Sequence, residues 1–253
     1  MNDTKVFILI AKTLLLVMSL LSAPTNAKAL VYLYTYHNKP PFVINQAKEE
    51  GLYFDLAASL SEHSSQYNFK TVYIPRKRLD HIISRQQLDG IVLDAAPRWF
   101  NDPDETVFRW SVGFYQDRDE FVSLKSAPFN YKKPSSFENK SLATVAGYYY
   151  FGINEAVLEN KLSRVDTVGE LQVLELIAKQ RVDFGIVSYS VFKYLIKNGD
   201  VIDIYHTSPI PHDEFQRRAF GPQELTPALE EFNRLIQRFK NQGHLASLIG
   251  QYQ

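Results

Sequence analysis

The chain has 253 residues, of which 45% are hydrophobic and 22% are charged, a balance typical of a globular protein with one large domain or two modest ones. Lysine and arginine number 28, as do aspartate and glutamate, so the formal net charge of zero gives no global basic field for nucleic acid and no acidic tail for a basic partner. The absence of cysteine excludes disulfide bonds, thiolate metal sites, a cysteine nucleophile and a cysteine-anchored lipid.

The N-terminal segment differs in composition from the rest of the chain. Lys5 precedes the apolar run VFILIAKTLLLVMSLLSA, and small residues follow at Ala27 and Ala29. This order is typical of a secretory signal peptide, so we expect residues 1–29 to be removed by cleavage after Ala29, with Ala27 as second choice. A retained membrane anchor is the alternative, but the apolar part after Lys12 is shorter than the ~20 residues that a span needs. We therefore expect a protein of a bacterial periplasm.

Strands and helices alternate through the first half of the mature chain. The run LVYLYTY at 30–36 has the alternation of a strand, and Pro40 and Pro41 exclude a helix directly after it. The next elements are predicted as a helix at 51–66, a strand at 69–75, a helix at 76–87 and a strand at 88–95. This β-α-β-α-β order predicts a mostly parallel sheet covered by helices.

A similar order of elements returns in the second half. An extended run at 120–124 leaves the first lobe, and the following elements are predicted as a strand at 141–147, helical segments at 157–162 and 171–179, and a strand at 182–188 that runs into a helix. The C-terminal residues 225–253 are predicted to be helical, with an apolar face and a break at Gly243.

Two segments of the chain resemble each other. RQQLDGIVLD at 85–94 matches KQRVDFGIVS at 179–188 with an offset of 94 residues. The offset pairs Asp89 with Asp183, which we interpret as turn residues, and it pairs Asp94 with Ser188. Together with the repeated order of elements, this match predicts two similar α/β lobes.

The motifs in this order resemble the family 3 bacterial extracellular solute-binding proteins, the type II periplasmic receptors of ABC transporters that mostly capture polar amino acids. They are a signal peptide, a strand ending in PPF, a helix with GLYFDL, a polar turn before LDGI, a crossing strand, a second lobe, and a tail with FNRLI and GHLASLIGQY. The resemblance covers almost the whole mature chain. It implies two α/β lobes joined by two crossing strands, the first lobe formed by 30–121 plus 209–253 and the second by 122–208.

The fold of this family places the ligand in the cleft between the lobes, in agreement with the general rule that parallel sheets bind ligands at the carboxyl ends of their strands. Carrying the family's contact positions over to this chain gives the candidate ligand-binding residues Tyr36, Lys39, Arg76, Leu93, Asp94, Arg98, Tyr148, Tyr150 and Ser188.

Several of these residues depart from the family pattern. Ser188 stands where amino-acid receptors carry the aspartate that holds the ligand's α-ammonium, so we expect its repeat partner Asp94 to supply a carboxylate from the opposite wall. Arg76 is expected to bind a ligand carboxylate, and Arg98 is a second candidate. The stretch of chain from Asp89 to Arg98 is about three residues shorter than in the family that the sequence resembles.

Backbone groups are expected to add to anion binding in the second lobe. Tyr148 and Tyr150 follow Gly147 at an expected helix start, whose free N–H groups would favour an anion. Other roles stay open for these candidates: a solvated helix start for Arg76, a turn cap for Asp94 and ordinary packing for the tyrosines.

The resemblance implies a periplasmic solute-binding protein that captures a small polar, carboxylate-bearing, amino-acid-like molecule for an ABC transporter. It is expected to be a monomer with an inner-membrane permease as partner, without catalytic activity or cofactor. One alternative is a ligand-sensing module for a membrane partner. Another is a cyclohexadienyl-dehydratase-like enzyme on the same fold, with Asp94 or Glu155 as the acid. His37 lies near the expected cleft, but no other histidine has metal-ligand spacing, so no metal site is expected.

Overall fold

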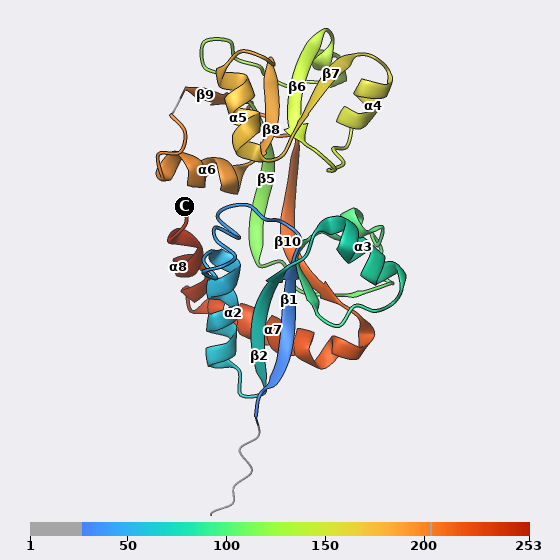
Figure 1. Cartoon of the computed structure of the whole chain (residues 1–253), viewed down its shortest axis with the longest axis vertical. Helices are drawn as coiled ribbons and strands as arrows, with labels where there is room; N and C mark the ends of the chain where they lie inside the picture. Colours follow the sequence, from blue (N-terminus) through green and yellow to red (C-terminus); the bar gives the residue numbers. More distant parts are fainter. Residues whose placement is uncertain (1–26, 203) are drawn as a thin grey trace, which may run out of the picture.

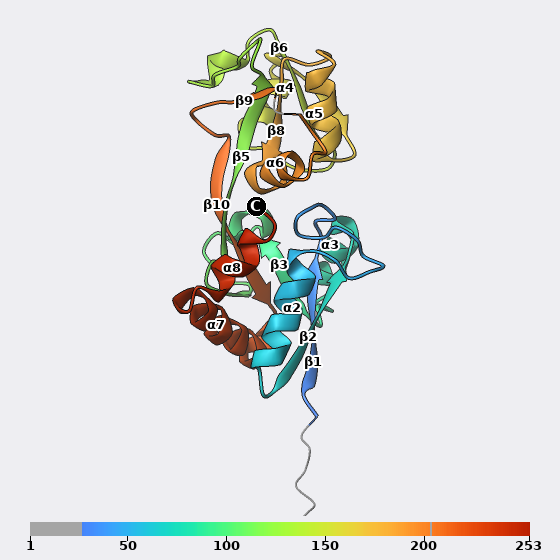
Figure 2. The ribbon, with the colours of Figure 1, turned by 90° about the vertical axis from the view of Figure 1, so that its left-hand side faces the viewer.

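The computed structural model describes residues 27–202 and 204–253, which form two lobes joined by two long strands (Figures 1 and 2). Of the predicted signal peptide, residues 1–26 lie outside the described residues, and the first strand begins at Ala29. Within the described ranges, no helix has the length and apolar character that crossing a membrane requires.

The lower part of Figure 1, which we call the first lobe, contains both ends of the described chain. Its elements are β1 (Ala29–Thr35), α2 (Leu52–His63), β2 (Tyr67–Tyr73), α3 (Arg76–Ser84), β3 (Ile91–Ala95), the 3-10 turn η1 (Pro97–Phe100), β4 (Arg109–Trp110), the 3-10 turn η3 (Gln223–Leu225), α7 (Thr226–Asn241) and α8 (His244–Gly250).

The upper part of Figure 1, which we call the second lobe, is formed by the middle of the chain. Its elements are the 3-10 turn η2 (Pro134–Phe137), β6 (Lys140–Val145), α4 (Ile153–Leu158), β7 (Leu162–Thr167), α5 (Glu170–Ala178), β8 (Phe184–Ser188), α6 (Tyr189–Lys197) and β9 (Tyr205–Thr207). The crossing strands are β5 (Tyr115–Leu124) and β10 (Asp213–Gly221), and they run through both lobes.

A continuous strand order connects the lobes. The hydrogen-bonded path is β2-β1-β3-β10-β5-β8-β6-β7, with β4 on β10 and β9 on β5. In the first lobe β1 pairs in parallel with β2 and β3, and in the second lobe β6 pairs in parallel with β7 and β8. The crossing strands pair antiparallel with a strand of each lobe, β10 with β3 and β5 with β8. The predicted mostly parallel sheets and two-lobed α/β fold are therefore confirmed.

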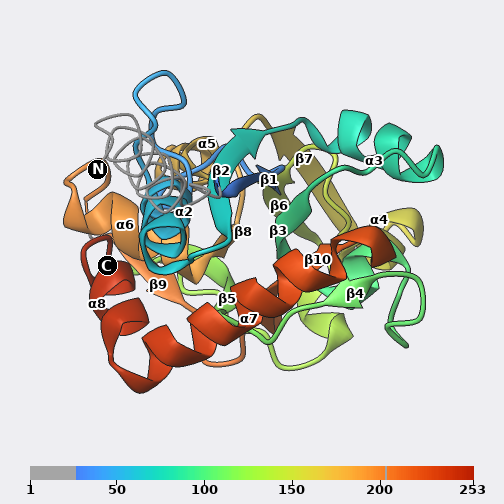
Figure 3. The same cartoon turned by 90° about the horizontal axis from the view of Figure 1, so that it is seen from below.

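The inner strands explain the continuous apolar runs in the sequence. All five residues of β3 and all five of β8 are buried, as expected for parallel strands that are covered on both faces. In the first lobe α2, α7 and α8 cover one face and α3 covers the other (Figure 3). The predicted leucine stripe of α2, at Leu52, Leu56 and Leu60, is buried in this core.

One predicted helical segment was wrong. Helical structure was expected around 157–162, but α4 ends at Leu158 and β7 begins at Leu162. Glu159 and Asn160 form a turn, with Asn160 at a positive φ of 56°, and Leu162 already pairs with Lys140 of β6, so the helix does not continue past Leu158. The expected domain boundaries stay a prediction; the one at 121/122 falls inside β5 and the one at 208/209 falls before β10.

Candidate ligand-binding site

A cavity of about 500 Å³ lies between the lobes. This volume is within the range of pockets that hold small molecules. The first lobe contributes the loop after β1, the start of α3 and the turn η1, and the second lobe contributes the loop after β6, the start of α5 and the end of β8. Most of these segments follow the carboxyl ends of parallel strands, where open sheets place their ligands.

The structure brings most of the predicted site residues together. The candidates that line the cavity are Tyr36, Lys39, Arg76, Arg98, Tyr148, Tyr150 and Ser188. They come from both lobes, and several contact one another. Their roles in binding a ligand stay predictions.

Leu93 and Asp94 do not line the cavity. Leu93 is fully buried and faces the first-lobe core under α2 and α7, because alternate residues of β3 point to opposite faces of the sheet. Asp94 is also fully buried, and its carboxylate forms an ion pair with the guanidinium of Arg217 on β10. The structure therefore directs Asp94 toward a crossing strand, away from the cation-binding role expected for it.

Arg217 is a buried cation that the sequence reasoning missed. Its side chain is 1% exposed and pairs with Asp94 and with Asp117, whose Oδ2 lies 2.6 Å from Nη2. Ser190 at the start of α6 donates to the same Asp117 oxygen at 2.6 Å. A buried charge needs such partners, so this network ties β3, both crossing strands and α6 together.

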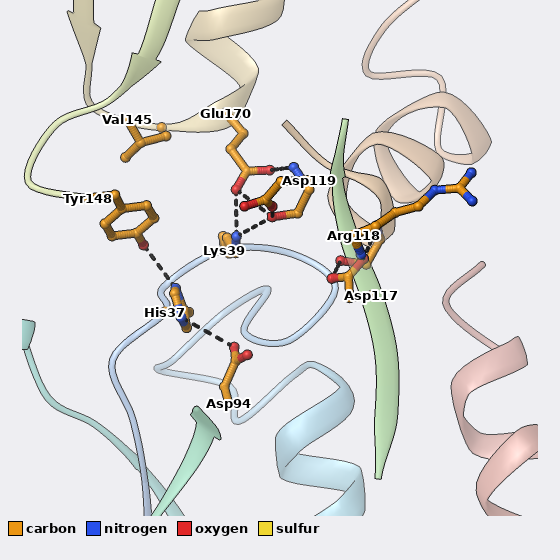
Figure 4. Close-up of polar contacts among 12 residues, drawn as sticks. His37, Lys39, Asp94, Asp117, Arg118, Asp119, Val145, Tyr148 and Glu170 are labelled. Atoms are coloured by element: carbon orange, nitrogen blue, oxygen red, sulfur yellow. Dashed lines mark hydrogen bonds and ion pairs between the residues drawn. The ribbon is translucent and has the colours of Figure 1, made fainter. Parts of the chain in front are cut away.

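Lys39 connects the two lobes directly (Figure 4). It lies in the loop after β1, and its Nζ is 2.5 Å from Oε1 of Glu170, the first residue of α5. Nζ also donates to Oγ of Ser188 at 2.9 Å. Burial opposes the charged form of Lys39, but the combined effect of Glu170, Tyr148 and Asp119 outweighs burial and raises the pKa of the lysine. Glu170 was not among the predicted residues, because nothing in its local sequence distinguishes it from a solvated helix start.

Asp119 on β5 lies beside this pair. Ser188 is its partner in the strand register, and the serine Oγ lies 3.0 Å from Oδ1 of Asp119. Burial, with the nearby carboxylates of Glu170 and Asp117, outweighs the attraction of Lys39 and raises the pKa of Asp119 to about 7. The site thus contains a carboxyl group that titrates near neutral pH. Asp119 was also missed, because it alternates with exposed residues in a run that reads only as a polar strand.

His37 forms a second contact between the lobes. Its Nδ1 is 2.9 Å from the hydroxyl of Tyr148, and the two rings meet edge to face at 5.5 Å. Burial and the positive charge of Lys39 lower the pKa of His37 well below its ordinary value, so the imidazole is neutral at pH 7. Among residues 27–202 and 204–253, no group of three or more histidine, aspartate or glutamate side chains could hold a metal ion.

The two predicted arginines also line the cavity. Arg76 begins α3, packs over the ring of Phe100 at 4.1 Å, and donates to Asp80 Oδ1 and to the carbonyl of Trp99, each at 2.8 Å. Arg98 in η1 forms an ion pair with Asp213. A guanidinium carries five N–H donors, so these contacts leave donors on both side chains for an anion.

The second-lobe tyrosines do not begin a helix. Tyr148 and Tyr150 lie in the loop after β6, and α4 starts only at Ile153 and has six residues. The helix N-terminus that was expected to favour an anion is therefore not at these residues. Tyr148 instead contacts His37, and Tyr150 is buried with its ring 5.8 Å from that of His212.

Comparison with known proteins adds to this geometry. No protein-family model matches the sequence, and no curated protein matches it. Solved structures do match: one from a study of glutathione import via GshT and the cystine ABC importer TcyBC of Streptococcus mutans has a TM-score of 0.70 and 16% identity, over 89% of this chain and 95% of that one. The GluR0 ligand-binding core from Nostoc punctiforme with L-glutamate has a TM-score of 0.66 and 15% identity, over 88% and 98%.

A third similar structure is the ancestral amino acid-binding protein AncCDT-1, described as a precursor of cyclohexadienyl dehydratase. It has a TM-score of 0.64 and 13% identity, over 88% of this chain and 95% of that one. These matches cover nearly the whole of both chains, so they show a shared fold; their identity is too low to show more than the fold. The chain therefore has the two-lobed α/β fold of the type II periplasmic binding proteins.

Proposed function

We propose that this chain is a periplasmic solute-binding protein that captures a small polar, carboxylate-bearing, amino-acid-like molecule for an ABC transporter. It acts as a monomer after removal of its signal peptide, and it delivers the solute to a permease in the inner membrane. The observation that carries the proposal is the cavity between the lobes, where Lys39 and Glu170 meet at 2.5 Å from opposite sides. A ligand enclosed by both lobes binds the closed form better than the open form and shifts the population toward it.

Several cavity residues have chemistry suited to such a solute. The free N–H donors of Arg76 and Arg98 are assigned to the carboxylate, as a fork of donors matches a carboxylate's two oxygens. Tyr36, Tyr148 and Tyr150 supply ring surface and hydroxyl groups around the ligand.

A test of this function follows the shape of the protein in solution. The chain is freed of bound solute by unfolding and refolding, and its radius of gyration is measured by X-ray scattering with and without the small-molecule fraction of a periplasmic extract. We expect the radius to fall when the extract is added. Lys39→Glu, which opposes Glu170 with a like charge, serves as a control that stays open. An unchanged radius for an open, refolded wild-type chain would count against ligand-driven closure.

A second candidate function is catalysis on the same fold. Asp94 and Glu155, the acids that the sequence suggests for this role, do not line the cavity, and Glu155 is exposed and accepts a hydrogen bond from Tyr149. Asp119 does line it, and its pKa of about 7 suits a general acid. Turnover of a cyclohexadienyl acid by the wild type, lost in Asp119→Asn, would favour the enzyme; absence of turnover favours the binding protein.

A further inference from the structure

The acidic groups of the cavity gather at one place, around Ser188. Glu170 accepts from the backbone N–H of Ser188 at 3.0 Å through Oε2, and its Oε1 lies 3.2 Å from the serine hydroxyl. Asp119 lies on the other side of the same hydroxyl, at 3.0 Å. Two carboxyl groups that converge on one point favour a cationic group there.

An ammonium group of the protein already occupies this point. Lys39 reaches across from the first lobe, and its Nζ contacts both Glu170 and Ser188. The lysine side chain is 14% exposed and the glutamate side chain 6% exposed, so the pair is largely removed from water. Ser188 accepts from Lys39 and has its own proton to donate to Asp119 or Glu170, which links the three charged groups through one hydroxyl.

A second ammonium has little to gain at this position. Glu170 is neutralised by Lys39, and the carboxyl group of Asp119 is partly protonated at neutral pH because its pKa is about 7. An incoming ammonium would therefore meet the like charge of Lys39 at close range. Displacing Lys39 would separate a largely buried ammonium from Glu170, the carboxylate with which it forms an ion pair.

We propose that the ammonium of Lys39 fills the cation subsite of the cleft, so that the protein selects small carboxylates without an α-ammonium, such as 2-hydroxy or 2-oxo acids, over α-amino acids. This inference rests on the proposed solute-binding function and narrows its ligand class. It also gives Ser188 a physical role. A neutral hydroxyl is sufficient at that position because the charge that needs balancing, on Lys39, is already balanced by Glu170.

The subsite can be tested without a known ligand. Lys39→Ala removes the equivalent of propylammonium from between Glu170 and Ser188, so n-propylammonium in solution should refill the space. By calorimetry we expect saturable binding to Lys39→Ala that is at least tenfold tighter than to the wild type, with a matching rise in thermal stability. There are two controls. 1-Propanol, which lacks the charge, should not bind to Lys39→Ala, and n-propylammonium should not bind to the double variant Lys39→Ala/Glu170→Gln.

Two results of this experiment would overturn the assignment. One is binding of n-propylammonium to the wild type as tightly as to Lys39→Ala, which would show a cation site that Lys39 does not fill. The other is a folded Lys39→Ala variant that does not bind the probe.

The selection itself is tested with pairs of L-amino acids and their 2-hydroxy acid counterparts, which differ only in ammonium against hydroxyl. We expect the wild type to bind the hydroxy acid of a pair at least tenfold more tightly. Lys39→Met, whose side chain ends one atom short of the ammonium, should shift that preference toward the amino acid. An amino acid that binds the wild type more tightly than its hydroxy counterpart would refute the proposal. If no pair binds either protein while n-propylammonium still binds Lys39→Ala, the subsite stands and the proposed solute class fails.

Discussion

Replacing Arg217 by methionine should destabilise the protein strongly. The guanidinium is 1% exposed, and it is the cation between Asp94 and Asp117, whose side chains are 0% and 1% exposed. Asp117 keeps hydrogen bonds from Ser190 after the change. Asp94 loses its ion pair, and the imidazole of His37, whose Nε2 is 3.8 Å from Oδ2, is neutral and does not replace the lost positive charge. The variant therefore leaves an uncompensated carboxylate in the interior at the junction of the lobes.

Breaking a buried ion pair by removing one partner costs about 3–5 kcal/mol, because the remaining charge stays buried without compensation. For a chain of this size each kcal/mol lowers the melting temperature by roughly 2–4 °C, so the expected fall is on the order of 10 °C. Burial already raises the pKa of Asp94 against the opposing effect of Arg217, so loss of Arg217 raises that pKa further and the folded variant binds more protons than the folded wild type. The deficit relative to the wild type should consequently shrink as the pH falls from 8 to 5.

Urea unfolding followed by circular dichroism measures this cost. Adding Asp94→Asn to Arg217→Met removes the stranded charge and should restore more than half of the lost unfolding free energy, whereas adding Asp117→Asn should restore less. A loss below about 1 kcal/mol for Arg217→Met, or no recovery from Asp94→Asn, would refute the view that charge compensation sets the stability here.

Three further outcomes are expected. The pKa of Asp119 is raised to about 7, so protonation of this carboxyl group stabilises the folded state below that pH. In urea unfolding, Asp119→Asn should therefore gain stability relative to the wild type as the pH rises from 5 to 8. The same dependence of stability on pH in both proteins would contradict this. Gly185→Ala would place a methyl group 2.4 Å from Val173 Cγ1 and should lower the free energy of unfolding by about 1–3 kcal/mol. Gly250→Ala, where an added Cβ would have no atom within 4 Å, should be nearly neutral. Equal shifts of the melting temperature in the two variants would argue against tight packing at β8. Protein isolated from the periplasm should begin within residues 28–30, and an intact mass of the full chain would exclude this cleavage.

The sequence was most informative where one strand or helix carries its own pattern. Apolar runs that follow a polar turn predicted the strands that correspond to β3 and β8, both of which are buried along their whole length. The apolar face of α7 and the break at Gly243, which has a positive φ of 73°, were recognised for similar local reasons. By contrast, β10 was expected only through the resemblance, because two arginines in succession in QRRAF are not typical of a buried strand. One of them, Arg217, is buried because Asp94 and Asp117, which are far away in the sequence, neutralise its charge.

The candidate site was harder to predict because its charges are paired across the fold. The repeat pairs Asp94, one residue before the end of β3, with Ser188, the last residue of β8. Both contact a crossing strand, Asp94 through Arg217 and Ser188 through Asp119. Which partner each residue takes depends on β5 and β10, and no local pattern encodes it. Glu170 lies 131 residues from Lys39 along the chain, so only the folded arrangement shows that the two neutralise each other.

Native mass spectrometry of the protein purified from the periplasm of its own organism tests the central claim most directly. A solute-binding protein should carry a non-covalent adduct of a few hundred daltons, since the cavity of about 500 Å³ holds a small molecule. The adduct should disappear on denaturation and be depleted in Arg76→Glu, which reverses the charge at the proposed carboxylate contact. Wild-type protein that is folded and free of any small molecule after gentle isolation, or an adduct retained equally by Arg76→Glu, would contradict the assignment of the cleft as a carboxylate-binding site.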